Sequence, residues 1–276
     1  MCVFGLFLLQ KYNFFANVRA DGAGFLYLCS MKDVLLEVCA GSLHSAMAAA
    51  QGGAQRVELC QALADGGLTP SVGLMRAVRG IEGLRLHVLI RPRGGDFLYT
   101  PAEVAIMEQD ILAAGEAGAD GVVIGALTAD GDVDVPVCQR LVQAAGGMSI
   151  TFHRAFDMCR HPEQALQDIL QLGCHRILTS GLAPSAMEGL PMLRRLVKMA
   201  GNQLSIMPGA GVTEYNAAQI IKETGAREIH ASLRSTVCSQ MRYRNEAVNM
   251  GAKGVDEFAL QETDARRVSE LLGRLQ

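Results

Sequence analysis

The 276-residue sequence has no tryptophan, no CxxC pair and no run of like charges. Its eight cysteines stand at wide spacings, which argues against a zinc finger or a disulfide framework. Free thiols in this number are typical of a reducing compartment, so we expect a cytoplasmic protein. The net charge of −3 offers no basic surface for nucleic acid. Crossing a bilayer takes about 20 apolar residues, and no such run is present, so neither nucleic acid nor a membrane is an expected partner.

The first 30 residues differ from the rest of the chain. They contain a short apolar run, residues 3–9, which is too short to span a membrane. A second methionine, Met31, stands directly before the first clear strand pattern. We therefore expect residues 1–30 to be a disordered extension and residues 31–276 to form one domain. A short targeting segment is the alternative for the extension.

One signature occurs four times along the domain. An amphipathic segment ends at a glycine, and an apolar strand begins two or three residues later, as where a helix ends and a strand follows. Each step spans about two βα units, so four steps give eight units. The sequence therefore predicts an α/β protein with a single (β/α)8 TIM barrel. An open doubly wound sheet is the weaker alternative, because no GxGxxG motif follows the first strand. The glycines are Gly53, Gly118, Gly173 and Gly225.

The expected elements follow from this pattern. Strands are expected at residues 35–39, 56–60, 85–91, 121–125, 149–153, 176–180, 204–208 and 228–232. Helices are expected near residues 42–51, 72–78, 102–115, 135–145, 162–172, 187–200, 214–224 and 264–275. The long segment 233–263 is expected to pack on one end of the barrel or against a neighbouring subunit.

Alternation along the strands assigns many polar side chains to the barrel interior. Apolar residues such as Leu36 and Val57 face the helices, which turns their neighbours inward. Buried charges must pair with one another, with water or with a ligand. A structural ion network is one interpretation, and a binding or catalytic site at the carboxyl ends of the strands is the one we favour. The inward-facing residues are Glu37, Cys39, Glu58, Cys60, His87, Leu89, Arg91, Thr151, His153, Glu228, His230 and Ser232.

The loops at the same end carry further candidates. Arg91 and Arg93 in the motif RPRGGDF are suited to bind an anion, unless they only clamp their own loop. In the motif TFHRAFD, Asp157 is placed to orient His153, as a general acid–base pair requires. The Gly-Ala-Gly loop after the seventh strand is similar to a phosphate-binding loop, with a tight turn as the alternative. The predicted anion site is completed by Ser180, Gly209, Gly211 and His230.

Two pairs of like residues are expected on the first two strands. Glu37 and Glu58 occupy equivalent places, so they should share one proton or a cation. Cys39 and Cys60 repeat this relation one layer higher, and two thiolates about 5 Å apart could bind a soft ion such as Cu(I) linearly. Two small core residues are the alternative for the cysteines.

Seven motifs stand in a characteristic order: EVC (37–39), RVELC (56–60), GGLTPS (66–71), IRPRGGDF (90–97), TFHRAFD (151–157), LTSG (178–181) and MRYRN (241–245). This order resembles the CutC family. The resemblance implies a copper homeostasis protein of the cytoplasm, or also of the nucleus, that binds Cu(I). It also implies a homo-oligomer, a tetramer in the animal members. The copper ligands of the family fall on Cys39 and Cys60, with His230 or His153 as a third.

Two functions therefore stay open. The first is a copper homeostasis protein that binds Cu(I) through thiolates at the carboxyl-terminal mouth of the barrel. The second is an enzyme for a small anionic or phosphorylated substrate, in which Arg91 and Arg93 hold the anion. A proton would then be moved by His153 with Asp157, or by Glu58. Copper trafficking does not need these groups, so enzyme activity stays open. A purely structural scaffold is a more distant interpretation.

Overall fold

The computed structural model describes residues 34–245, 247–248 and 256–276. The extension predicted for residues 1–30 lies outside the described residues. Strands and helices alternate along the described part of the chain. Among the described helices, none is long and apolar enough to cross a membrane.

The elements follow the predicted order closely. The barrel strands are β1 (Leu35–Ala40), β2 (Arg56–Leu59), β3 (Arg85–Leu89), β4 (Gly121–Ile124), β5 (Ser149–Phe152), β6 (Arg176–Thr179), β7 (Ser205–Pro208) and β8 (Glu228–Ala231). The α-helices are α1 (Leu43–Gln51), α2 (Val72–Arg79), α3 (Pro101–Glu116), α4 (Val135–Ala145), α5 (Pro162–Gln171), α6 (Leu190–Ala200), α7 (Ala217–Thr224) and α8 (Ala265–Arg274). Two short 3₁₀ helices, η2 (Leu63–Asp65) and η3 (Arg154–Met158), follow β2 and β5.

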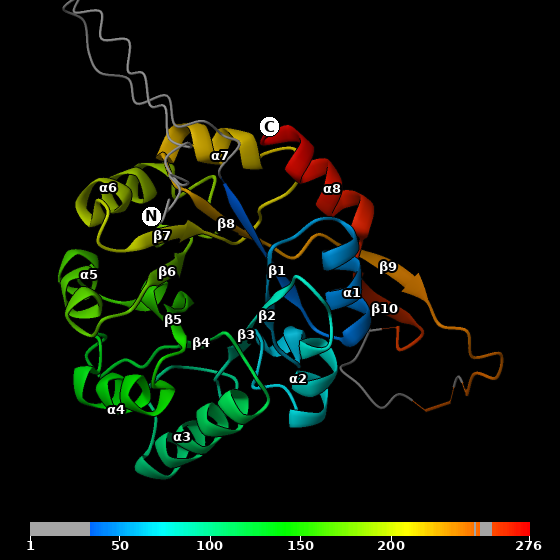
Figure 1. Ribbon diagram of the computed structural model, residues 1–276, viewed down its shortest axis with the longest axis horizontal. Coiled ribbons are helices and arrows are strands. Elements are labelled where there is room, and N and C mark those ends of the chain that lie inside the picture. The colour runs from blue at the N-terminus through cyan, green and yellow to red at the C-terminus, as the bar shows by residue number, and fades with distance from the viewer. Residues whose placement is uncertain (1–33, 246, 249–255) are drawn as a thin grey trace, which may run out of the picture.

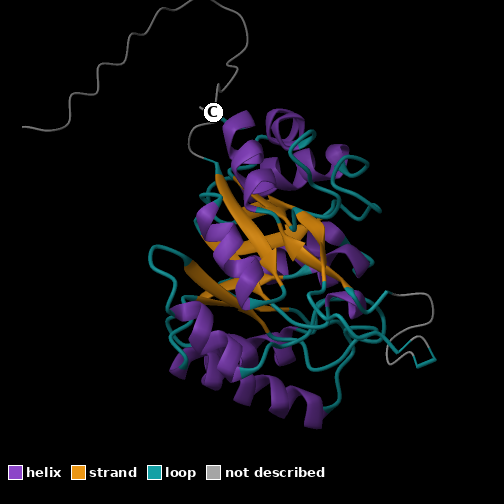
Figure 2. Ribbon diagram, turned by 90° about the vertical axis from the view of Figure 1, so that its right-hand side faces the viewer, coloured by secondary structure: helices purple, strands orange, loops and turns teal. Residues whose placement is uncertain are grey.

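The strands β1 to β8 form one parallel sheet that curls into a barrel. Hydrogen bonds join them in the order β7-β6-β5-β4-β3-β2-β1-β8. The two ends of this order, β7 and β8, lie side by side (Figure 1). The helices surround the strands (Figure 2). The predicted (β/α)8 TIM barrel is confirmed, and a doubly wound sheet is excluded because its strand order would reverse at a switch point.

Local signals in the sequence explain where the helices begin and end. Thr100 and Glu103 form a capping box, in which each side chain accepts a hydrogen bond from the backbone N–H of the other, and α3 starts there. The repeated glycines follow the helices. Their own backbone adopts the left-handed conformation, which glycine reaches without steric cost. Their φ angles are 95°, 84°, 78° and 74° at Gly53, Gly118, Gly173 and Gly225.

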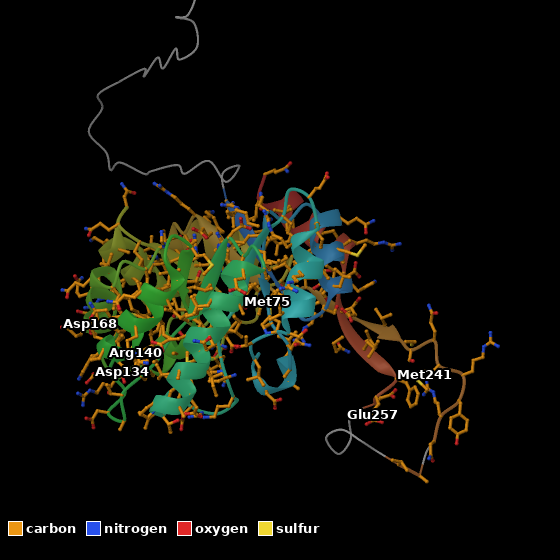
Figure 3. All side chains as sticks on the ribbon, turned by 60° about the horizontal axis from the view of Figure 1, so that its bottom comes forward. Met75, Asp134, Arg140, Asp168, Met241 and Glu257 are labelled. Atoms are coloured by element: carbon orange, nitrogen blue, oxygen red, sulfur yellow. The ribbon has the colours of Figure 1, made fainter. Side chains whose placement is uncertain are left out.

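The segment between β8 and α8 forms an antiparallel hairpin of β9 (Arg234–Cys238) and β10 (Ala259–Thr263). Its base is fixed by Glu262, whose carboxylate accepts hydrogen bonds from the hydroxyls of Ser42 and Ser45, each at 2.5 Å. From this base the hairpin projects away from the barrel, as the positions of Met241 and Glu257 show (Figure 3). The base of the segment thus packs against α1 of the barrel, and the predicted alternative, packing against a neighbouring subunit, stays a prediction.

Charged side chains fill the interior of the barrel near the start of its strands. Arg56 is 1% exposed. Its Nε donates a hydrogen bond to Glu37 at 2.5 Å, and its second terminal nitrogen donates to Glu228. Arg176 donates from Nε to the same Glu228 carboxylate at 3.2 Å. Two guanidinium groups thus balance two carboxylates, and part of the inward-facing charge forms a structural ion network.

Glu37 lies at the centre of this network. Its oxygens are 2.9 Å from His230 Nδ1 and 3.7 Å from His87 Nδ1. Burial alone would raise the pKa of Glu37, but the charge of Arg56 and the hydrogen bond with His230 hold that pKa well below its usual range. Burial lowers the pKa of His87 to about 3, so this ring is neutral. Gly121 makes room for it, since a Cβ there would lie 2.6 Å from His87 Nε2.

Replacing Arg56 by methionine should lower the free energy of unfolding by about 3–5 kcal/mol, because the buried carboxylate of Glu37 and the half-buried carboxylate of Glu228 lose their shared cation. The matched control is Arg140→Met on α4, which breaks a solvent-exposed pair with Glu108 (Figure 3). Such pairs contribute little to stability. Urea unfolding of both variants measures the difference. Equal losses in the two variants would contradict a buried network that depends on Arg56.

His87 predicts a dependence of stability on pH. Between pH 6.5 and about 3, the unfolded chain carries a proton on His87 that the folded chain does not. The free energy of unfolding should therefore fall as pH falls through this window. In His87→Phe, which keeps a ring at the position, the fall should be shallower by about 1.4 kcal/mol per pH unit, the effect of one proton. Urea unfolding at a series of pH values tests this, and parallel curves for the two proteins would refute it.

Candidate functional site

A cavity of about 340 Å³ opens at the carboxyl ends of the strands. Strands β1, β2 and β8 contribute one side of it, the thiol wall, which consists of Cys39, Glu58, Cys60 and His230. The segments that follow β3 and β5 contribute the donor corner, which consists of Arg91, Phe97 and His153. The lining also contains four apolar side chains, those of Leu63, Leu89, Met158 and Leu178.

The two cysteines of the thiol wall converge. Cys39 lies in β1 and Cys60 directly after β2, and both thiols are free. Their Sγ atoms are 3.5 Å apart. Hydrogen bonding with Cys60, together with burial, raises the pKa of the Cys39 thiol well above its usual range. The pair is therefore close enough to share an ion, and a metal would have to displace a thiol proton from Cys39.

The prediction that Glu37 and Glu58 occupy equivalent places is wrong in register. Across the two strands Glu37 pairs with Arg56, and Glu58 pairs with Cys39. The imidazole of His230 lies between the carboxylates, with Nδ1 2.9 Å from Glu37 and Nε2 3.7 Å from Glu58. Burial would lower the pKa of His230, but its contacts with Cys39 and Glu37 and the charge of Glu58 raise it well above its usual range. The cation that the two carboxylates share is therefore a side chain of the protein.

The thiol wall fits a soft ion. The two sulfurs and a carboxylate oxygen of Glu58 all lie within 4.8 Å of one another. Thiolates select soft ions such as Cu(I), whereas carboxylates suit harder ones. With metal–sulfur bonds of about 2.3 Å, sulfurs 3.5 Å apart would subtend about 100° at an ion, and a linear ion would need about 4.6 Å. The predicted linear geometry thus requires Cys39 and Cys60 to move apart by about 1 Å, whereas trigonal three-coordination, which needs about 4.0 Å, requires only about half of that movement.

His153 stands between β5 and η3 and is buried. Its Nδ1 accepts a hydrogen bond from the backbone N–H of Ala155 at 3.1 Å, which leaves the proton of the neutral ring on Nε2. Burial, and then the charge of Arg91, lowers the pKa of His153 to about 3. Gly125 leaves space for the ring, because a Cβ there would lie 2.5 Å from it. At neutral pH His153 is therefore a hydrogen-bond donor and not a general base.

Asp157 does not orient His153, contrary to the prediction. Its carboxylate accepts hydrogen bonds from Arg154 Nε at 2.7 Å, Thr179 Oγ1 at 2.5 Å and the backbone N–H of Ser180 at 3.0 Å. The turn of η3 gives His153 a backbone partner and directs Asp157 to the loop after β6. The Ser180 hydroxyl is itself occupied by Arg154, which donates to it at 3.1 Å. The enzyme hypothesis thus loses its acid–base pair.

Arg91 is buried at the rim of the donor corner. One terminal nitrogen donates to the backbone carbonyls of Asp65 and Gly67, at 2.8 and 2.9 Å. The other donates to the carbonyl of Gly95 at 2.8 Å. Its Nε has no hydrogen-bond partner among the described residues. Arg91 therefore joins its own loop to the loop after β2, and its Nε–H group remains without an acceptor among the described residues.

Three other predicted anion-binding residues are not part of the lining of this cavity. Arg93 donates from Nε to Glu103 at 2.6 Å on the surface, so it clamps the loop. Gly209 serves packing, because a Cβ there would lie 2.5 Å from Leu178 Cδ1. Gly211 has a φ of 68° and lines a neighbouring depression of about 430 Å³ beside the loops after β7 and β8.

Some residues of the site were not among those predicted. Arg56 stands two residues before Glu58 on the same inward face, so the alternation of the strand contained the signal for it. The same holds for Arg176, two residues before Leu178. Arg154 belongs to a 3₁₀ turn, where no periodic pattern marks the direction of a side chain.

The comparisons with known proteins agree on one family. The sequence model of the CutC family matches residues 34–235. A family protein CutC of Chromobacterium violaceum is 54% identical over 239 residues, which cover 87% of this chain and 97% of the relative. The copper homeostasis protein cutC homolog of Homo sapiens is 46% identical over 238 residues, 86% of this chain and 87% of the relative.

Solved structures give the same result. The crystal structure of CutC from Streptococcus agalactiae aligns with a TM-score of 0.69 at 36% identity, over 71% of this chain and 97% of that one. Thiamine phosphate pyrophosphorylase of Pyrococcus furiosus aligns with a TM-score of 0.54 at 15% identity, over 89% of this chain and 96% of that one. The second likeness concerns the fold alone.

Proposed function

The chain belongs to the CutC family, and from this premise we propose that it is a copper homeostasis protein that binds Cu(I) through Cys39 and Cys60. The observation that carries the proposal is the separation of 3.5 Å between two free sulfurs that line a cavity. Two thiolates at this distance form a soft donor pair. The name of the human relative, copper homeostasis protein cutC homolog, supports copper as the bound ion.

The surroundings of the sulfurs define how the ion would be held. Cys39 and Cys60 supply two bonds, and the angle of about 100° leaves room for a third donor. Glu58 has an oxygen within 4.8 Å of both sulfurs, and the imidazole of His230 lies beside it. Each thiol that binds the ion must lose its proton, so the affinity for Cu(I) should rise with pH.

Anaerobic titration with Cu(I) against a chromophoric chelator tests the proposal. The reduced wild-type chain should take up one tightly bound ion, because two thiolates are available to it. The double variant Cys39→Ser/Cys60→Ser should lose this uptake. The control is Cys238→Ser, which removes an exposed thiol of β9 and should bind copper like the wild type. Retention of tight uptake by the double variant would refute the proposal.

We further propose that the hairpin of β9 and β10 mediates homo-oligomerisation. Val237 and Leu260 are direct cross-strand neighbours, and they are 39% and 48% exposed. Met241 and Tyr243, which follow β9, are 62% and 74% exposed. An isolated two-stranded hairpin is only marginally stable. Coverage by a second copy of the chain would bury these side chains and stabilise the hairpin.

Sedimentation of Val237→Ser/Leu260→Ser should show a smaller assembly than the wild type, because the exposed apolar pair is lost. The matched control, Ile106→Ser/Leu112→Ser, removes two apolar side chains of α3 that are 51% and 48% exposed. This control should sediment like the wild type. A monomeric wild-type chain, or an assembly that the hairpin variant leaves intact, would count against the proposed role.

A further inference from the structure

Two buried nitrogen donors of the donor corner have no protein partner. His153 Nε2 and Arg91 Nε have no hydrogen-bond partner within 3.5 Å among the described residues, although the buried hydroxyl of Tyr99 lies close enough to Arg91 to interact with it. The two residues are only 5% and 6% exposed. Both line the same cavity. Buried donors in folded proteins are nearly always paired, so these two indicate an acceptor that a ligand supplies.

The charge of Arg91 favours an anionic acceptor. The guanidinium is fixed by three backbone carbonyl groups, which are uncharged, of Asp65, Gly67 and Gly95. It lies 5.2 Å from the centre of the Phe97 ring, and the same ring is centred 5.0 Å from that of His153. A buried cation held beside a neutral N–H group is suited to a carboxylate, since charge-assisted hydrogen bonds are the stronger ones.

The two carboxylates that line the cavity are bound elsewhere. Asp157 also lines the cavity, but its carboxylate is bonded to Arg154 and to the loop after β6. Glu58 lies on the thiol wall next to His230. The space between is apolar, with Leu89, Leu178 and Met158 in its lining. Its volume of about 340 Å³ suits a small organic molecule and exceeds what a single ion needs.

We propose that the cavity binds a small organic monocarboxylate with an apolar body. The carboxylate oxygens accept hydrogen bonds from His153 Nε2 and Arg91 Nε. The apolar body packs against Phe97, Leu89 and Leu178 and extends toward the thiol wall. A phosphate group would bring two charges to one guanidinium, so a monocarboxylate is the better match. This ligand is independent of the metal, and its binding does not require the two thiols.

Ligand binding is tested on the full chain, in the presence of a Cu(I) chelator, so that failure of the copper proposal does not affect the result. Saturation-transfer NMR is recorded with a panel of small aromatic and branched aliphatic carboxylic acids. Their primary amides, inorganic phosphate and small phosphate esters form the comparison arms. Acids with an apolar body should bind, and their amides should bind more weakly because they lack the charge that Arg91 recognises.

His153→Asn is the informative variant. The asparagine oxygen can still accept from the Ala155 N–H, as a capping side chain does, but the Nε2 donor is lost. The Kd of the strongest acid should rise about tenfold to a hundredfold, the loss expected for one charge-assisted hydrogen bond. The control is His161→Asn, which changes an exposed histidine at the start of α5 and should leave the Kd unchanged.

Leu89→Phe provides a second route, because it fills the cavity and leaves every polar group in place. It should abolish binding of the acids, and circular dichroism shows whether each variant is folded. The proposal is overturned if no acid of the panel binds the wild type, or if phosphate binds in preference. It is equally overturned if acids bind a folded His153→Asn or Leu89→Phe variant as tightly as the wild type.

Discussion

The interior of this barrel depends on keeping one carboxylate, that of Glu37, ionised without access to water. A buried charge is tolerated only where cations and hydrogen bonds surround it. Arg56 meets this need from the start of β2, and His230 meets it from β8. Since His230 also lines the cavity, the ion network that fills the barrel positions a residue of the candidate site. The residues that balance the buried charge and the residues that line the cavity therefore belong to one network.

The simple alternation of strands accounts for much of the site. It placed Cys39, Glu58, Cys60 and His230 inside the barrel, and all four line the cavity. The prediction from alternation succeeds because the apolar neighbours of these residues must face the helices. The polar residues are then left with one direction, toward the barrel interior. The order of the elements follows for a similar reason, because helix ends and strand starts carry local signals of their own.

Relations between strands could not be predicted in the same way. Parallel strands of a barrel are staggered, and the size of the stagger is absent from any single strand. Glu37 therefore pairs with Arg56 and not with Glu58. The direction of Asp157 depends on a 3₁₀ turn whose geometry has no periodic signature. In both cases the residue types were identified correctly and their partners were not, because partners are set by three-dimensional geometry.

Charge balance constrains how the two proposed ligands, Cu(I) and a monocarboxylate, could occupy one cavity. A copper ion held by two thiolates carries a net charge of −1, and a bound monocarboxylate carries the same charge. Two anions in one cavity repel unless each has its own cation. Arg91 stands in the donor corner with only neutral partners, and His230 stands in the thiol wall. The imidazole of His230 contacts Glu37 at 2.9 Å and Glu58 at 3.7 Å, and Glu37 is balanced by Arg56 as well. In the proposed copper complex, His230 would therefore balance the dithiolate as a cation, since it would have to give up its proton to bind the metal.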